Sequence, residues 1–197
     1  MSALLWTAAP AAGMTRSTGW PAACVLDTNI VLDIWVFEDP HVQPVRRLLK
    51  LPGLGLTAEP SGAASLPAAV PDAPGEGHPV VRWLATRAMR DELARVLTYP
   101  HLVRRQPLGE QAAHALLAAY DAAVTWCEPA PKARFVCTDA DDQKFIDLAV
   151  AHGAVLVSKD KAVLRLKKRL ASLGVEVLRS WPGQPADHTP KLGAQSA

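Results

Sequence analysis

Short apolar runs alternate along the chain with longer segments in which apolar residues recur every three or four positions. Runs of the first kind predict strands buried on both faces, and segments of the second kind predict helices that cover them. The predicted strands are 22–26, 80–85, 124–127, 154–157 and 175–178. The predicted helices are 30–51 with a break near Asp39 and Pro40, 87–97, 109–123, 141–152 and 161–173. This alternation predicts a Rossmann-like, three-layer α/β/α sandwich with a central parallel sheet of about five strands.

Residues with known preferences for helix ends stand at several of these boundaries. Thr86 is suited to cap the helix that follows it, and Gly153 and Gly174 are suited to end the helices before them. Tyr99-Pro100 is expected to stop the helix that begins after Thr86, because the residue before a proline disfavours helical backbone.

Three segments fall outside the predicted elements. Residues 1–20 are expected to form a flexible leader that starts at Met1 or Met14, and they lack the basic beginning of a signal peptide. Residues 52–79 are rich in Pro, Gly and Ala and predict an inserted loop. Residues 181–197 predict a disordered tail, so one domain is expected between the leader and the tail, over 21–180.

Composition narrows the class of protein without choosing a function. Hydrophobic residues make up 49% of the chain, which is enough for a folded core, and the net charge of +2 argues against a strongly basic coat for nucleic acid. Cys24, Cys127 and Cys137 show no paired spacing, so they are interpreted as core residues in a reducing, cytoplasmic compartment. No segment has the length and apolar content expected of a membrane span.

The candidate chemistry begins in the stretch ACVLDTNIVLDIW. An apolar strand there ends abruptly in Asp27, Thr28 and Asn29, before apolar residues resume. Ligands of parallel sheets bind at the carboxyl ends of the strands, and Asp27 stands at such an end. A carboxylate at this position also suits the N-cap of a helix, so the position by itself does not choose between the two roles.

Three more acids have predicted positions on the same edge. Asp160 follows the fourth strand, Asp142 lies in the first turn of a helix on its core-facing side, and Glu92 lies about two turns into the helix after the second strand. Taken singly, each has an ordinary explanation. Asp142 and Asp160 suit helix N-termini, and Glu92 suits a solvated helix face.

Together the four carboxylates predict a cation site. Two carboxylates about 4 Å apart repel each other by roughly 4 kcal/mol at an effective dielectric constant near 20, so either protons or a divalent cation must neutralise the group. Hard oxygen ligands suit Mg²⁺ or Mn²⁺ rather than Zn²⁺. A metal held by acids activates water and stabilises charge on a phosphodiester, so the sequence predicts a metal-dependent phosphodiesterase.

The ordered set of motifs resembles the PIN-domain family of nucleases. The resemblance covers about 24–178 apart from the inserted segment, and its pieces are VLDTNIVLD, RDELARVL, DDQKFIDLAVAHGA and LVSKDKAVL. It implies a PIN-like fold whose acidic positions are Asp27, Glu92, Asp142 and Asp160. The DDQKF and SKDKAVL stretches are most similar to the branch of toxins of toxin–antitoxin pairs.

The resemblance implies cleavage of single-stranded RNA with Mg²⁺ or Mn²⁺, a cognate antitoxin protein as partner, and a homodimer. The four acids are predicted to hold the metal, and Glu92 also to assist deprotonation of the attacking water. Thr28 and Ser158 are predicted to order the acids or the substrate phosphate through their hydroxyl groups. Asn29 is predicted to tie the loop after the first strand to its neighbours, with contact to the substrate as the less favoured alternative. The lysines predicted to bind the RNA backbone, with solvated surface lysines as the open alternative, are Lys144, Lys159 and Lys161.

Three other classes of protein compete with an active PIN nuclease. A haloacid-dehalogenase-type phosphatase needs a second Asp where this chain has Asn29, and a receiver-type signalling domain places its phosphorylated Asp after the third strand. A PIN fold that binds RNA or protein without cleaving it commonly lacks one acid, whereas this chain keeps all four. The active enzyme is therefore the main hypothesis, and the catalytically silent binding module is the alternative.

Overall fold

A computed structural model describes residues 21–54, 80–105 and 109–182. Within these residues, five parallel strands form one sheet in the order β3-β2-β1-β4-β5. The strands are β1 (Ala23–Leu26), β2 (Arg82–Ala85), β3 (Val124–Trp126), β4 (Val155–Val157) and β5 (Val177–Leu178). Every residue of β1 and of β4 is apolar and buried, as expected of central strands that are covered on both faces.

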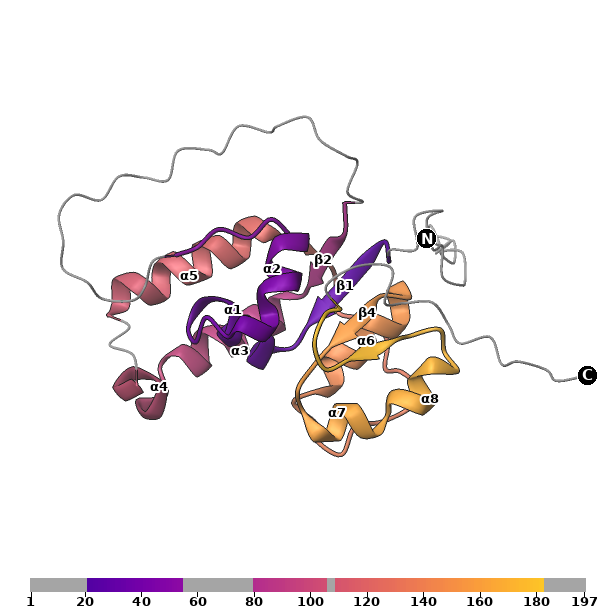
Figure 1. Cartoon of the computed structure of the whole chain (residues 1–197). Helices are drawn as coiled ribbons and strands as arrows, with labels where there is room; N and C mark the ends of the chain where they lie inside the picture. Colours follow the sequence, from indigo (N-terminus) through magenta and orange to yellow (C-terminus); the bar gives the residue numbers. More distant parts are fainter. Residues whose placement is uncertain (1–20, 55–79, 106–108, 183–197) are drawn as a thin grey trace, which may run out of the picture.

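Helices cover both faces of this sheet. They are α1 (Thr28–Trp35), the short 3₁₀ helix η1 (Pro40–Val42), α2 (Gln43–Leu48), α3 (Arg87–Leu97), α4 (Pro100–Arg105), α5 (Glu110–Ala123), α6 (Gln143–His152), α7 (Lys161–Arg165) and α8 (Lys167–Ala171). In Figure 1, α1, α2, α3 and α5 lie on one side of the sheet and α6, α7 and α8 on the other. The prediction of an α/β/α fold around about five parallel strands is therefore confirmed.

The chain reverses its direction across the sheet at β1. It runs outward from β1 through β2 to β3, and then returns past β1 to β4 and β5. Right-handed crossovers therefore put the helices of the two halves on opposite faces of the sheet. Ligands of open parallel sheets bind at such a reversal, outside the carboxyl ends of the two strands that flank it. Here these strands are β1 and β4, which lie side by side.

The register of β1 against β4 decides which residues meet at that edge. Leu26 pairs with Val157, and the N–H of Asp27 donates to the Val157 carbonyl at 3.0 Å. Asp27 and Ser158, the first residues beyond the two strands, are thereby neighbours. Polar side chains at these positions lie outside the apolar sheet while the sheet itself fixes their separation.

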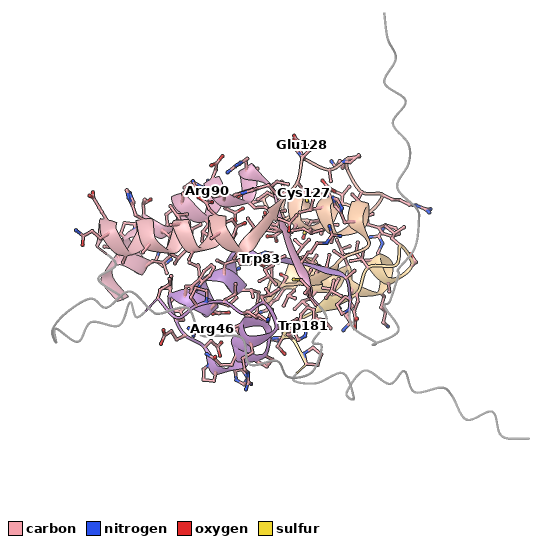
Figure 2. The ribbon with its side chains drawn as sticks, turned by 90° about the horizontal axis from the view of Figure 1, so that it is seen from above. Arg46, Trp83, Arg90, Cys127, Glu128 and Trp181 are labelled. Atoms are coloured by element: carbon pink, nitrogen blue, oxygen red, sulfur yellow. The ribbon has the colours of Figure 1, made fainter. Side chains whose placement is uncertain are left out.

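An aromatic cluster anchors the helices of one face. Trp83 on β2 is only 2% exposed, and its ring centroid lies 5.9 Å from that of Trp35 on α1 and 5.0 Å from that of Tyr120 on α5. Figure 2 shows Trp83 in the middle of the molecule. Large rings in edge-to-face or tilted contact contribute much buried area, so this cluster fixes α1 and α5 relative to β2.

Two helical segments differ from the sequence prediction. α4 forms directly after the expected stop at Tyr99 and Pro100, because proline suits the first position of a new helix and the Tyr99 carbonyl accepts its first hydrogen bonds. The helix predicted over 161–173 is divided into α7 and α8 at Leu166, whose N–H bonds to the Val163 carbonyl in a tighter turn.

The helix ends predicted at Thr86, Gly153 and Gly174 and the break near Asp39 and Pro40 are confirmed. Gly153 ends α6 with a φ of +56°, and Gly174 follows α8 with a φ of +77°, a region of backbone conformation that favours glycine. Thr86 occupies the N-cap position of α3. The break near Asp39 and Pro40 is the start of η1, where Asp39 accepts the His41 N–H at 2.9 Å.

The predicted terminal and inserted segments are only partly described. The parts outside the described residues are the leader 1–20, residues 55–79 of the insertion and residues 183–197 of the tail. Trp181, at the start of the predicted tail, is buried. None of the helices in the described part is long and apolar enough to cross a membrane.

Truncation of the central tryptophan tests the assignment of the aromatic cluster to the core. Trp83→Ala is expected to lower the free energy of unfolding by about 3–5 kcal/mol, because it removes a large buried ring and leaves a cavity. Urea unfolding followed by circular dichroism measures the change. Val80→Ala, at a 73% exposed side chain just before β2, is the control and should change stability by less than about 0.5 kcal/mol. A loss no larger than the control's would contradict the assignment.

Candidate active site

Asp27 directly follows β1 and is only 2% exposed. Its Oδ1 accepts the Asn29 N–H at 3.4 Å, which caps α1, and its Oδ2 accepts the Ser158 hydroxyl at 2.7 Å. Burial raises the pKa of Asp27, these two hydrogen bonds oppose the rise, and the negative charges of Glu92 and Asp160 add to it. Asp27 is therefore at once a helix cap and a member of a group of acids.

Ser158 links the carboxyl ends of β1 and β4. Its side chain is fully buried, and besides donating to Asp27 its Oγ accepts the Asp160 N–H at 3.0 Å. Asp160 in turn caps α7, with its Oδ1 accepting the Ala162 N–H at 2.5 Å. One hydroxyl group thus holds the loop after β1 and the loop after β4 in a fixed relation.

Asp142 occupies the N-cap position of α6, but its carboxylate makes no capping hydrogen bond. Its Oδ2 is buried and has no hydrogen-bond partner among the described residues. α6 packs against β1 and β4 and precedes β4, so its N-terminus lies at the edge where these parallel strands end. Burial raises the pKa of Asp142 to about 7, and nearby negative charge adds to the rise. The acids that contribute this charge are Asp27, Asp160, Asp139 and Glu92.

Glu92 reaches the same edge from α3, on the other face of the sheet. The helix is fastened to α5 by a two-pronged ion pair, in which Arg90 Nε lies 2.7 Å from Asp121 Oδ1 and Arg90 Nη2 lies 3.0 Å from Asp121 Oδ2. The carboxylate of Glu92 contacts the ammonium group of Lys144, which comes from α6. Helices of opposite faces therefore meet at the carboxyl edge, and Lys144 balances part of the negative charge there.

The four predicted acids are thus brought to one edge of the sheet. Asp27 and Asp160 are joined through Ser158, and Asp142 and Glu92 are coupled to them by charge. No group of three or more His, Cys, Asp or Glu side chains within the described ranges is arranged to hold a metal ion.

The donor set nevertheless suits a hard divalent cation. All four groups are carboxylates, which are the ligands that Mg²⁺ and Mn²⁺ prefer. The orphaned Oδ2 of Asp142 is a buried polar atom that needs a partner, and burial, followed by the charge of nearby acids, raises the pKa of Asp142 and so disfavours its charged form. A bound cation would supply both needs, with Asp27, Asp142 and Asp160 as ligands and Glu92 joining them once Lys144 moves aside.

The three lysines predicted to bind substrate differ in their settings. The Nζ of Lys159 lies 2.7 Å from Oδ2 of Asp33 and 2.7 Å from Oδ2 of Asp39. Burial opposes the charge of Lys159, but its hydrogen bonds with these two acids raise its pKa. Lys159 therefore ties the loop after β4 to α1 and to the start of η1. Lys144 is engaged at the acids, as described above, and Lys161 is exposed at the start of α7.

Thr28 and Asn29 are the remaining residues of the predicted site. Thr28 is buried as the first residue of α1, and Asn29 is exposed, with its backbone N–H bonded to Asp27. Their predicted roles, through the Thr28 hydroxyl and the Asn29 side chain, stay predictions.

Two polar residues that were not predicted as site residues bind the segment that precedes Asp142. Oδ1 of Asp147 accepts the Ala133 N–H at 2.8 Å and an N–H of the Gln143 side chain at 2.6 Å. Oε1 of Gln143 accepts the Cys137 N–H at 2.7 Å. Gln143 and Asp147 thus hold the segment before Asp142 against α6. Their spacing of four residues on a predicted helix, next to a segment without secondary structure, was the feature of the sequence that could have indicated this contact.

A comparison with protein families identifies the class. A family model described as a PIN domain matches residues 23–162, which is more than half of the chain and includes all four acids. The chain therefore belongs to the PIN-domain family. PIN domains are in general nucleases, so membership indicates activity of the nuclease type. No match was found among curated proteins or among solved structures.

Removal of the Asp142 charge tests the electrostatic coupling. The pKa of about 7 means that between about pH 4 and pH 7 the folded state keeps a proton that the unfolded state has lost, so wild-type stability falls as the pH rises through this window. Asp142→Asn is expected to stabilise the protein at pH 7, in buffer with a chelator, because it removes a charge that is disfavoured by burial and also by the neighbouring acids. Solvent screening limits the gain to on the order of 1 kcal/mol. Urea unfolding at a series of pH values measures the difference.

The matched control for this experiment is Asp141→Asn, which removes the same charge from the exposed neighbouring residue. Its stability should follow that of the wild type across the same pH range. An Asp142→Asn protein that gains nothing between acid and neutral pH, or gains no more than the control, would contradict the coupling of the four acids.

Proposed function

We propose that this PIN domain is an endoribonuclease that cleaves phosphodiester bonds of single-stranded RNA with Mg²⁺ or Mn²⁺. The observation that carries the proposal is the meeting of four carboxylates, from four separate segments, at the edge where β1 and β4 end. Such a concentration of charge is costly to the fold, and a cation-dependent reaction gives it a use.

Hydrolysis of a phosphodiester makes two demands on the site. Water must lose a proton while its oxygen forms a bond to phosphorus, and the alcohol oxygen whose bond to phosphorus breaks must gain a proton, which solvent water can supply. A divalent cation held by the acids would activate the attacking water and stabilise the charge of the phosphate. The chain supplies the remaining groups from α3, α6 and the loops after β1 and β4.

Each residue has a proposed part in this reaction. Asp27, Asp142 and Asp160 are cation ligands, and Ser158 keeps the first and last of these in register. Glu92 joins as a ligand, directly or through water, and assists removal of the proton from the attacking water. If Glu92 joined a bound cation, the ammonium group of Lys144 would be free to bind a phosphate of the RNA.

A catalytically silent PIN module that binds RNA or protein is the second candidate. The observation that favours it is the contact between Lys144 and Glu92, because an ammonium group within a group of acids can take the place of a cation. In such a module the ion pair between Lys144 and Glu92 would persist, and the four acids would stabilise the fold without taking part in a reaction.

The biological role that we propose is that of a toxin in a toxin–antitoxin pair. It rests on the similarity of DDQKF and SKDKAVL to the toxin branch of the family, and it includes a cognate antitoxin protein, a homodimer and action in the cytoplasm. A small upstream reading frame for a DNA-binding protein would support this role. Its absence would leave the nuclease proposal standing and remove the argument for an antitoxin.

Cleavage assays test the enzyme directly. With Mn²⁺, wild type is expected to cut an end-labelled single-stranded RNA and to leave the matching duplex intact. Asp27→Asn should lower the rate by about 100-fold or more, since even residues that only support metal ligands are worth about 10- to 100-fold. Asp91→Asn, at an exposed residue next to Glu92 on α3, is the control and should cut like wild type. Equal cleavage by wild type and Asp27→Asn would end the proposal.

Cation binding separates the enzyme from the silent module without an activity measurement. Isothermal calorimetry of wild type should detect uptake of Mn²⁺ at millimolar concentration or below, and Asp160→Asn should weaken it. Lys144→Ala is expected to bind Mn²⁺ about 3- to 10-fold more tightly, because a half-buried competing charge worth on the order of 1 kcal/mol is gone. No uptake by either wild type or Lys144→Ala would favour the silent module.

A further inference from the structure

A hollow in the surface extends from the start of α1 to α4, and its lining has no part in the chemistry described above. Its volume is about 320 Å³, near the lower end of the range of about 300–1,000 Å³ that is typical of small-ligand sites. Phe37, Tyr99 and His101 line it with aromatic rings, and Leu32 and Leu102 add apolar side chains that are buried. Phe37 is 40% exposed, so a large part of its ring is open to a ligand.

Asn29 joins this hollow to the acids. Its exposed side chain lines the hollow, while its backbone N–H is bonded to Oδ1 of Asp27. The start of α1 thus borders both the hollow and Asp27, so a ligand that extends past Asn29 can contact both.

We propose that the hollow binds one unstacked base of the RNA strand, next to the nucleotide whose phosphate lies at the acids. This inference rests on the proposed function, and it adds a specificity site to it. The aromatic rings stack on the base, and the Asn29 amide, which offers both donors and an acceptor, reads its edge. Stacking accepts every base, so any preference among bases comes from polar groups of the lining, among which Asn29 is the one next to Asp27.

The contents of the hollow favour a base over a protein segment. The rings of Tyr99 and His101 lie 5.8 Å apart between centroids and tilt by 45°, so they present faces in different directions around a compact space. A docked helix would need a longer groove with anchors at successive turns, and a docked strand would need an open sheet edge. A single planar group with polar edges matches a small space that has aromatic walls and one amide.

A double-mutant cycle between protein and RNA tests the proposal. Fluorescence anisotropy measures the Kd of a labelled single-stranded RNA for the full chain, with Ca²⁺ in place of Mg²⁺ or Mn²⁺ and with the RNA verified as intact on a gel. Phe37→Ala is expected to weaken binding by between about 5- and 100-fold, the range for loss of one base–aromatic stack. Phe37→Trp should keep the affinity, and Phe37→Leu, which is apolar but has no ring, should lose most of it.

RNAs with one abasic nucleotide, moved along the strand, complete the cycle. One abasic position should weaken binding to wild type by the same factor, and that penalty should vanish in Phe37→Ala, because both changes remove the same contact. Val80→Ala, at a 73% exposed residue before β2, is the control and should keep the full abasic penalty.

Three results would overturn the inference. The first is an abasic penalty that is equal in wild type and Phe37→Ala. The second is a loss of dimer in sedimentation, with unchanged RNA affinity, when Phe37 is replaced by Ala, which would assign the hollow to a protein contact. The third is equal affinity of Phe37→Leu and wild type. A failure of the proposed function is recognised separately, because the cleavage assay compares wild type with Asp27→Asn and uses no Phe37 variant.

Discussion

Four carboxylates at one edge of a sheet repel one another, and much of the local structure compensates for that repulsion. The buried Oδ2 of Asp27 receives the Ser158 hydroxyl, while Asp160 accepts a helix N–H and Glu92 contacts Lys144. Each donor supports an anion that burial would otherwise disfavour. Asp142 Oδ2 lacks such a donor among the described residues, and burial together with the neighbouring acids raises the pKa of Asp142 to about 7. The pKa of Asp27 is also raised, although its two hydrogen bonds oppose the rise.

The topology of the sheet decides where this charge accumulates. Because the strand order reverses at β1, loops from both halves of the chain open onto the same edge, and α6 starts there as it returns to β4. Segments that are far apart in the sequence therefore converge without any long loop reaching across the molecule. The aromatic cluster on β2 and the ion pair between α3 and α5 fix the helix that carries Glu92. Packing far from the edge thus sets the geometry at the edge.

Most of the fold could be predicted from the sequence because its signals are local. Apolar runs, helix periodicity and the glycines at 153 and 174 depend only on neighbouring residues, and they located the strands and most helices. The division of the helix at Leu166 and the new helix at Pro100 depend on how turns pack against the rest of the fold. A short stretch of sequence carries no information about that packing. The positions of the acids could be predicted because strand ends in a parallel sheet share an edge. The ion pairs of Lys159 with Asp33 and Asp39 could not be predicted, because they join the loop after β4 to α1 and η1, which are distant in sequence.

Helix capping and cation binding need not compete as explanations of these acids. Asp27 and Asp160 each use one oxygen to cap a helix, which fixes the side chain through a backbone N–H and costs the other oxygen little freedom. Two capped carboxylates, held in register by Ser158, form a rigid pair, whereas Asp142 keeps a buried oxygen without a described partner. A cation entering this edge would meet two preorganised ligands and one that gains a partner, so most of the ordering cost is already met in the folded chain. The capping hydrogen bonds give Asp27 and Asp160 an ordinary structural role, and the same bonds would hold these two carboxylates in place to bind a cation.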